Sequence, residues 1–363
     1  MNTQPDSPSV KTFSSNDYDS LLQGLLEAFS PSTQERPASE YLAGWMAAAG
    51  FDRAYVDESD SAVGILGDGP CELVMLGHID TVPGLINVEK KDGKLYGRGA
   101  VDAKGPLATF AAAAATIGRR PGWKIVVVGG TEEEAVSSRG AHFQTTQFHP
   151  TYCVIGEPSQ WDRVTLGYKG RLLMDYKFIR PLTHTARPDL NAIGHAVTYY
   201  NAVAADVASI NEDRDKAFDQ VFTGIRSIHS SEDGFHETVV MTLGFRLPVD
   251  YPPEVMKPRL LTYADGAEIV FRGEEVAIRC ERNTPLVRAF NNAIRDQGGK
   301  PGYVYKTGTS DMNIVGPRWN CPMVAYGPGD SSLDHTPHEH IVLDDYYNGI
   351  GVVVNMLREL TSS

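Results

Sequence analysis

A histidine and two aspartates follow apolar parts of the chain at a spacing that a metal site needs. His78 and Asp80 come directly after the short apolar run 72–76, which predicts a buried strand. Because residues i and i+2 of an extended chain point the same way, Asp80 can accept the spare N–H of His78 and fix which ring nitrogen faces a metal. Asp102 lies in the glycine-containing segment 99–105, and its two carboxylate oxygens are suited to bridging two ions. The pattern indicates a dinuclear metal site.

A run of three glutamates follows another predicted strand. The apolar residues 124–128 lead through 129–131 into Glu132, Glu133 and Glu134. Such a run is often a solvated helix start, where carboxylates interact favourably with the helix dipole. Directly after a buried parallel strand, it is also placed to enter the crevice where α/β enzymes bind ligands. There one carboxylate can bind a metal while its neighbour handles the proton of a metal-bound water.

Two further segments add carboxylate and imidazole groups. The predicted strand 152–155 ends just before Glu157, and a loop rich in glycine, proline and serine precedes His335, His338 and His340. Histidines combined with several carboxylates suit zinc, cobalt or manganese better than calcium. Each element alone is a weak signal, but in this order they predict a metal-dependent active site.

Composition and charge restrict the class of protein. The chain has 363 residues, more than one hydrophobic core usually serves, so we expect two domains. Its hydrophobic share of 42% and charged share of 22% are typical of soluble proteins, and no apolar run approaches the roughly 20 residues of a membrane helix. Without a signal-peptide core, and with four scattered cysteines, we expect a cytoplasmic protein with reduced thiols. The net charge of −13 argues against nucleic-acid binding.

The order of predicted elements indicates an insertion. Strands and helices alternate up to Glu157, which is typical of an α/β fold with a mainly parallel mixed sheet. From 166 to 280 the pattern changes to strand 171–179, helix 191–211, strand 237–247, helix 252–261 and strand 268–280. We therefore expect a discontinuous catalytic domain, 1–165 with 281–363. The inserted domain, 166–280, would be an α+β (ferredoxin-like) lid that also serves dimerisation.

These motifs resemble those of the metallopeptidase and deacylase family that includes acetylornithine deacetylase, succinyl-diaminopimelate desuccinylase and glutamate carboxypeptidase. The resemblance runs from about residue 70 to the C-terminus. It implies a zinc-peptidase-like domain that hydrolyses a linear amide with two divalent ions, Zn²⁺ or Co²⁺, and a cis peptide bond after Asp102. The implied metal ligands are His78, Asp102 (as the bridge), Glu133, Glu157 and His335. Glu132 would be the general base and Asp80 would orient His78, while His338 and His340 fall outside the ligand set.

The same resemblance extends to the inserted region. His184 resembles a lid histidine that reaches the neighbouring subunit's site and helps to stabilise the oxyanion, which implies a homodimer. The alternative is an ordinary polar loop histidine. Arg246 resembles a carboxylate-binding arginine, whose planar fork can hold a carboxylate bidentately, and an edge-strand salt bridge is the alternative.

Other polar residues could also contact a substrate. The loop containing Gly308, Thr309 and Ser310 could hold a substrate carboxylate through its N–H and hydroxyl groups, or it could be an ordinary capped turn. Lys169 and Arg171 would bring positive charge to the domain junction. We therefore include these residues among the candidates for substrate binding.

The strings 96–107, 132–141 and 306–313 most resemble one branch of the family. That branch releases lysine or ornithine from the C-terminal glutamate of the small amino-group carrier protein LysW, in lysine biosynthesis, with arginine biosynthesis as an open alternative. Because the carrier is acidic, a local basic patch would have to offset the repulsion, formed by Lys169, Arg171, Arg180 and Arg187. The alternatives are a deacetylase of acetylornithine or acetyl-lysine, a dipeptidase, and an inactive binding scaffold. Glu132 and the full ligand set favour an enzyme.

Overall fold

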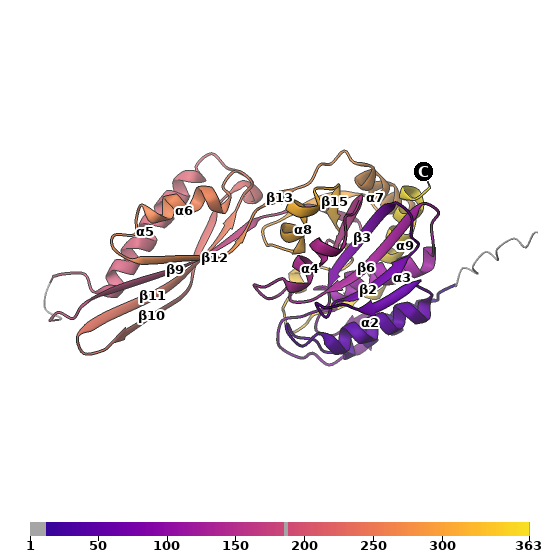
Figure 1. Cartoon of the computed structure of the whole chain (residues 1–363), viewed down its shortest axis with the longest axis horizontal. Coiled ribbons are helices and arrows are strands. Elements are labelled where there is room, and N and C mark those ends of the chain that lie inside the picture. Colours follow the sequence, from indigo (N-terminus) through magenta and orange to yellow (C-terminus); the bar gives the residue numbers. More distant parts are fainter. Residues whose placement is uncertain (1–11, 185–187, 363) are drawn as a thin grey trace, which may run out of the picture. The chain divides into compact units, whose positions relative to one another are not determined.

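The computed structural model describes residues 12–184 and 188–362. The chain forms two compact units, which can be followed by colour in Figure 1. The first unit comprises the chain up to Leu166 with Cys280–Val304 and Ile314–Ser363, and the second comprises Gly167–Arg279 and Tyr305–Asn313. From the sequence we expect residues 305–313 to belong to the discontinuous domain 1–165 with 281–363. The structure groups them with the second unit instead. The catalytic, lid and dimerisation roles expected of the two parts stay predictions.

A mixed sheet with parallel pairing at its centre forms the core of the first unit. Its strands lie in the order β1 (Arg53–Val56), β2 (Ala62–Leu66), β6 (Trp123–Gly130), β3 (Cys71–His78), β7 (Tyr152–Gly156), β15 (Met323–Ala325) and β8 (Arg163–Tyr168). β3 is parallel to both β6 and β7, and β15 is parallel to β7, whereas β2 is antiparallel to β6. Two short strands, β13 (Ile278–Arg279) and β14 (Gly302–Lys306), pair with β8. The predicted α/β fold with a mixed sheet is confirmed.

The central strands bring the ends of three segments to one edge of this sheet. Residues 73–76 of β3 and 125–128 of β6 have no exposed surface, as is usual for parallel strands covered on both faces. His78 at the end of β3 pairs with Gly130 at the end of β6, and Gly77 pairs with Gly156 at the end of β7. The residues that follow these three strands therefore emerge side by side.

Helices surround the sheet. α3 (Lys104–Ile117) is buried along nearly its whole length, and it packs against α1 (Ser15–Glu27), α9 (Leu343–Leu360), β3 and β6. Its alanine run 111–115 permits this close packing because the side chains are small. The first unit also contains α2 (Arg36–Ala49), α4 (Arg139–Gln147), α7 (Pro285–Asp296), η2 (Ser331–Leu333) and a small sheet of β4 (Glu89–Lys91), β5 (Lys94–Tyr96) and β16 (His340–Val342). Among the described helices, none has the length and apolar character needed to cross a membrane.

The second unit is an antiparallel sheet with two helices packed on it. The strand order is β10 (Phe222–Glu232), β11 (His236–Leu247), β9 (Gly170–Pro181) and β12 (Glu268–Glu275). α5 (Ala192–Ile210) and α6 (Pro253–Leu261) share a hydrophobic core with alternate residues of β9, such as Leu172, Met174 and Tyr176. The second unit also contains η1 (Ala217–Asp219) and the start of α8 (Asp311–Trp319). The strands and helices expected for this region are present. The sequence does not predict β10, because this edge strand is largely polar and exposed and lacks apolar alternation.

A substitution at Gly156 tests whether the close approach of the ends of β3 and β7 requires a residue without a side chain. A Cβ atom at this position would lie 2.9 Å from both Gly77 Cα and Phe110 Cε2. We expect Gly156→Ala to lower the free energy of unfolding by about 1–3 kcal/mol, the usual cost of overpacking. The matched control is Gly44→Ala in α2, where a Cβ meets nothing within 4 Å, so that a gain of about 0.5–1 kcal/mol is expected. Urea denaturation followed by circular dichroism measures both, and equal effects would contradict the packing account.

Candidate metal centre

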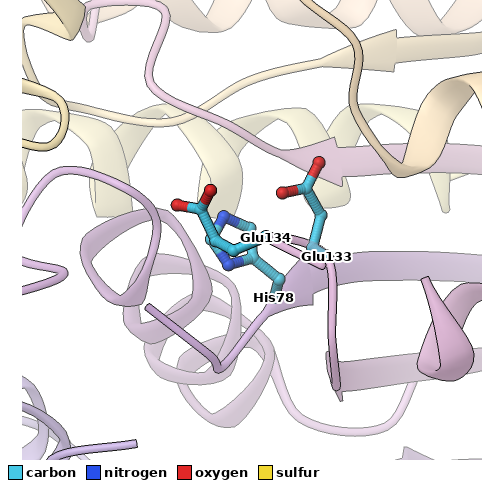
Figure 2. A group of neighbouring side chains, drawn as sticks. All are labelled: His78, Glu133 and Glu134. Carbon is cyan, nitrogen blue, oxygen red and sulfur yellow. The ribbon is translucent and has the colours of Figure 1, made fainter. Parts of the chain in front are cut away.

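Three groups of potential ligands lie at this edge of the sheet. Within each group, the ligand atoms are all within 4.8 Å of one another, and the groups are His78–Asp102–Glu157, Asp102–Glu134–His335 and His78–Glu133–Glu134. Asp102 belongs to the first two groups. Figure 2 shows His78, Glu133 and Glu134, with the Glu134 carboxylate beside the His78 ring and the Glu133 carboxylate turned to the other side.

Asp102 lies between two imidazoles. Its Oδ1 atom is 3.1 Å from His78 Nε2, and its Oδ2 atom is 3.1 Å from His335 Nε2. His335 Nε2 is also 2.8 Å from Glu134 Oε1. A carboxylate that directs its two oxygens to two different ligand groups has the arrangement expected of a bridge between two ions. The peptide bond after Asp102 is cis, as the resemblance implies.

Hydrogen bonds within the ligand groups shift the pKa values of His78, Asp102 and His335. Burial opposes a charge on His78, but hydrogen bonds with Asp102 and Asp80 raise the pKa of its imidazole well above the usual value. Hydrogen bonds with Asp102 and Glu134 raise the pKa of His335 to about 10. Burial opposes ionisation of Asp102, yet its bonds with both histidines hold the pKa of that carboxyl well below its ordinary value. Divalent cations compete with protons for such groups, so this donor set fits metal ions.

Asp80 links β3 to the glutamate run. The side chain is fully buried. His78 Nδ1 lies 3.0 Å from the Asp80 carbonyl oxygen and 3.4 Å from its Oδ1, which leaves Nε2 facing Asp102. The Asp80 carboxylate accepts hydrogen bonds from the backbone N–H groups of Glu133 and Glu134, each at 3.1 Å, and from Ser32 Oγ at 2.7 Å. Asp80 therefore orients the histidine and holds the backbone of both neighbouring glutamates.

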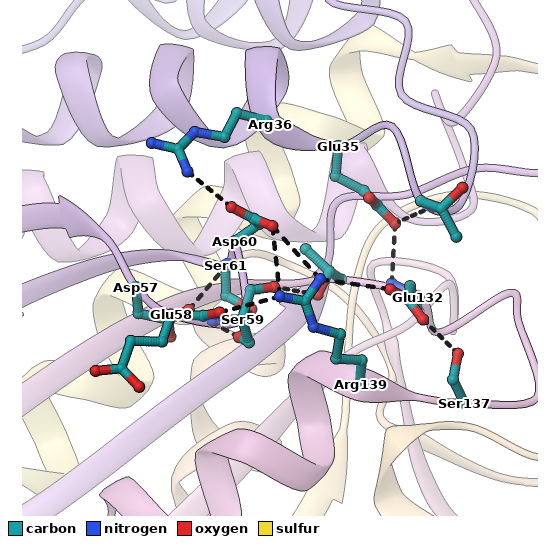
Figure 3. Close-up of polar contacts among 12 residues, drawn as sticks. Glu35, Arg36, Asp57, Glu58, Ser59, Asp60, Ser61, Glu132, Ser137 and Arg139 are labelled. Carbon is teal, nitrogen blue, oxygen red and sulfur yellow. Dashed lines mark hydrogen bonds and ion pairs between the residues drawn. The ribbon is translucent and has the colours of Figure 1, made fainter.

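Glu132 is placed differently from its two neighbours. It belongs to none of the ligand groups found among the described residues. Its carboxylate accepts a hydrogen bond from Ser137 Oγ and lies 3.6 Å from Arg139, and its backbone N–H donates to Glu35 (Figure 3). A φ of 61° puts Glu132 in the left-handed region, which few residues other than glycine adopt. The two partners of the Glu132 side chain, Ser137 and Arg139, lie outside the ligand groups.

The structure gives the three glutamates different surroundings, and the roles that the resemblance implies for Glu132 and Glu133 stay predictions. Glu134 contacts His335 and shares a ligand group with Asp102, and Glu133 shares a ligand group with His78 and Glu134. The Glu132 carboxylate contacts Ser137 and Arg139. Composition alone cannot separate three consecutive glutamates, whereas the structure gives them different partners.

The three histidines of the C-terminal loop differ in whether they belong to a ligand group. His335 joins a ligand group, and its side chain is 50% exposed. His340 directs Nδ1 to the His338 carbonyl oxygen at 2.7 Å, and its ring lies against Tyr96 with the centroids 4.8 Å apart. Neither His338 nor His340 is in a ligand group of the described residues. The role of His335 as a metal ligand stays a prediction, and its place in a ligand group supports it.

Lys169 is not the exposed cation that the sequence suggests. Its side chain is fully buried, and Nζ donates to the carbonyl oxygens of Ala217, at 2.7 Å, and Gln220. The ammonium group also lies over the Phe222 ring, 3.8 Å from its centroid. Burial lowers the pKa of Lys169 to about 8. Lys169 therefore satisfies backbone carbonyls inside the second unit, and its expected role in substrate binding stays a prediction.

The expected basic patch is largely neutralised within the second unit. Arg171 forms an ion pair with Glu275, and Arg180 lies 3.2 Å from Glu237. Arg187 lies outside the described residues. Lys169 is buried. The three members that the structure describes therefore do not form an unpaired positive surface by themselves.

The other substrate-binding candidates in the second unit have different surroundings. Arg246 donates to Thr309 Oγ1 at 3.0 Å. Ser310 Oγ accepts from the N–H of Met312, so that this part of the loop is a capped helix start, the alternative considered from the sequence. A Cβ at Gly308 would meet nothing within 4 Å, so the space beside it is open. His184 is exposed.

Comparison with known proteins is consistent with this geometry. Residues 74–359 match the family model described as Peptidase family M20/M25/M40. A "[LysW]-lysine hydrolase" of Deinococcus radiodurans is 41% identical, covering 94% of this chain and 96% of that protein. A "[LysW]-lysine/[LysW]-ornithine hydrolase" of Saccharolobus islandicus is 30% identical, covering 94% of this chain and 95% of that protein.

A solved structure shares the fold. The M20 family metallo-carboxypeptidase of Sulfolobus solfataricus superposes with a TM-score of 0.77, covering 95% of this chain and 99% of that one. At 17% sequence identity, this likeness concerns the fold alone. The family match covers most of the chain, and the resemblance drawn from the motifs is thereby confirmed. The chain belongs to peptidase family M20/M25/M40, a family of hydrolases.

Proposed function

We propose that this chain is a metal-dependent amide hydrolase that releases lysine from the C-terminal glutamate of the carrier protein LysW, in lysine biosynthesis in the cytoplasm. The names and the coverage of the relatives support the substrate. One structural observation supports the hydrolytic chemistry above all: the Asp102 carboxylate lies between two groups of histidine and carboxylate ligands.

We assign the ligands as two sets that share Asp102. His78, Asp102 and Glu157 would hold one divalent ion, and Asp102, Glu134 and His335 the other. Nitrogen and carboxylate donors in this proportion suit Zn²⁺ or Co²⁺. When bound, such ions lower the pKa of a shared water and polarise a carbonyl group.

Glu133 is the residue best placed to move protons. It shares a group with His78 and Glu134, and Asp80 holds its backbone N–H. In the proposed reaction Glu133 accepts the proton of the attacking water and later donates a proton to the leaving amine. Glu132 holds the turn that carries Glu133 and Glu134, through Ser137 and Arg139.

Residues of the second unit would contribute binding and oxyanion stabilisation. We propose that Arg246, with its partner Thr309, binds a carboxylate of the substrate. The open space at Gly308 is available for the same substrate group. We further propose that the protein is a homodimer in which the exposed His184 serves the site of the neighbouring subunit.

The substrate is tested directly by turnover of LysW-linked lysine beside acetylornithine. We expect the zinc- or cobalt-loaded enzyme to hydrolyse the carrier conjugate far more efficiently, as measured by amino-acid release and kcat/KM. The same preparation of Glu133→Gln should be inactive on both, which excludes a contaminating hydrolase. A higher kcat/KM for acetylornithine would favour the simple deacetylase instead.

The roles of the three glutamates are separated by single substitutions. Glu133→Gln should retain both ions but lose on the order of 10²–10⁴ in turnover, the usual contribution of general acid–base catalysis. Glu134→Gln should lose metal, because it removes a ligand charge. Glu132→Gln should retain both the ions and more activity than either. Metal analysis after dialysis, with steady-state kinetics, measures these effects, and loss of metal from Glu133→Gln but not Glu134→Gln would reinstate the assignment implied by the resemblance.

Subunit mixing tests the role of His184. Glu133→Gln and His184→Ala proteins should each be inactive alone, but hybrid dimers contain one site with both residues intact. We therefore expect partial activity to appear after mixing under conditions that permit subunit exchange. Labelled subunits and size-exclusion chromatography verify the exchange. Proven exchange without recovered activity would show that His184 does not act on the neighbouring site.

A further inference from the structure

A buried ion pair lies beside the ligand groups without belonging to them. Arg98 Nη1 is 2.8 Å from Glu339 Oε2, and the side chains are only 7% and 1% exposed. We propose that Arg98 and Glu339 are positioning residues that hold Asp102 and His335 in place and so set the affinity for metal, above all at the position formed by Asp102, Glu134 and His335. This inference rests on the proposed function, since it presupposes that these groups bind metal.

Glu339 acts on the segment that carries Asp102. Its Oε1 atom accepts hydrogen bonds from the backbone N–H groups of Val101, at 3.0 Å, and Asp102, at 3.1 Å. The other oxygen, Oε2, is taken by Arg98. The carboxylate therefore fixes two successive peptide groups, and with them the point from which the Asp102 side chain departs.

Arg98 acts on the segment that carries His335. Besides its bond with Glu339, Nη1 donates to the carbonyl oxygen of Thr336, the residue after His335, at 3.2 Å. Its Nε donates to the carbonyl oxygen of Gly84 at 2.9 Å. A planar guanidinium can serve several acceptors at once, whereas a lysine ammonium on a flexible stem cannot reproduce this fork.

The pair thus joins two segments that are far apart in the sequence and that both carry proposed ligands. Asp102 and His335 lie 3.1 Å apart at their nearest polar atoms, and each is adjacent to a backbone group held by the pair. Groups that orient metal ligands in this way typically contribute 10–100-fold to metal affinity. The position that uses both Asp102 and His335 should depend on the pair more than the position that uses Asp102 alone.

A second ion pair provides a matched control for the effect of removing a partly buried charge. Glu72 pairs with Lys124 at 2.5 Å, and its other oxygen accepts the backbone N–H of His149 at 2.8 Å. Glu72 therefore combines the same two kinds of contact as Glu339. It lies near the start of β3, six residues and about 20 Å of extended chain from His78.

The experiment is calorimetric titration of the metal-free, full-length protein with Zn²⁺ or Co²⁺, at a temperature where circular dichroism shows each variant to be folded. We expect wild type and Glu72→Gln to bind two ions alike. Glu339→Gln should weaken one of the two by 10–100-fold and the other less. Arg98→Lys should also weaken binding although it retains the positive charge.

Wild-type affinity for both ions in folded Glu339→Gln would overturn the inference, and so would an equal loss in Glu72→Gln. If Glu339→Gln does not fold, Arg98→Lys decides: wild-type affinity in that variant contradicts the inference, and weakened binding supports it. Failure of the wild-type protein itself to bind two ions would instead contradict the proposed function, so the two failures are distinguishable.

Discussion

Carboxylates gathered at the ends of β3, β6 and β7 repel one another, and the protein must supply positive charge to hold them together. The strand register creates this crowding, because His78 pairs with Gly130 and Gly77 with Gly156. The two imidazoles lie among these carboxylates, whose hydrogen bonds and charge raise the pKa values of His78 and His335. Divalent cations would meet the same need more fully, since each carries two charges and accepts several ligands. The geometry therefore links the fold directly to metal-dependent hydrolysis.

Buried polar contacts outside the ligand groups keep this arrangement in place. Asp80 joins the end of β3 to the backbone of Glu133 and Glu134, and Glu339 joins the backbone of Asp102 to Arg98. Both carboxylates are almost completely buried, where an unpaired charge would be costly. Each accepts backbone N–H groups as well as a cationic or polar partner, so the same contacts satisfy the buried charge and fix the proposed ligands.

Much of the fold and part of the site could be predicted from the sequence, for physical reasons. Apolar runs such as 73–76 and 125–128 form the buried parallel strands because such strands require apolar residues on both faces. The different partners of Glu132, Glu133 and Glu134 could not be predicted, because they depend on the local backbone, which includes a left-handed residue at Glu132. The burial of Lys169 depends on carbonyl groups at Ala217 and Gln220, in a stretch without a strong sequence pattern.

The central claim is that Asp102 bridges two metal positions. Crystallographic anomalous scattering from zinc-loaded protein, recorded on both sides of the zinc absorption edge, tests it most directly. The account predicts two peaks roughly 3.5–4 Å apart, one bound by His78, Asp102 and Glu157 and the other by Asp102, Glu134 and His335, with ligand atoms about 2.0–2.2 Å from each ion. A single peak, or two peaks of which only one is bound by Asp102, would contradict it.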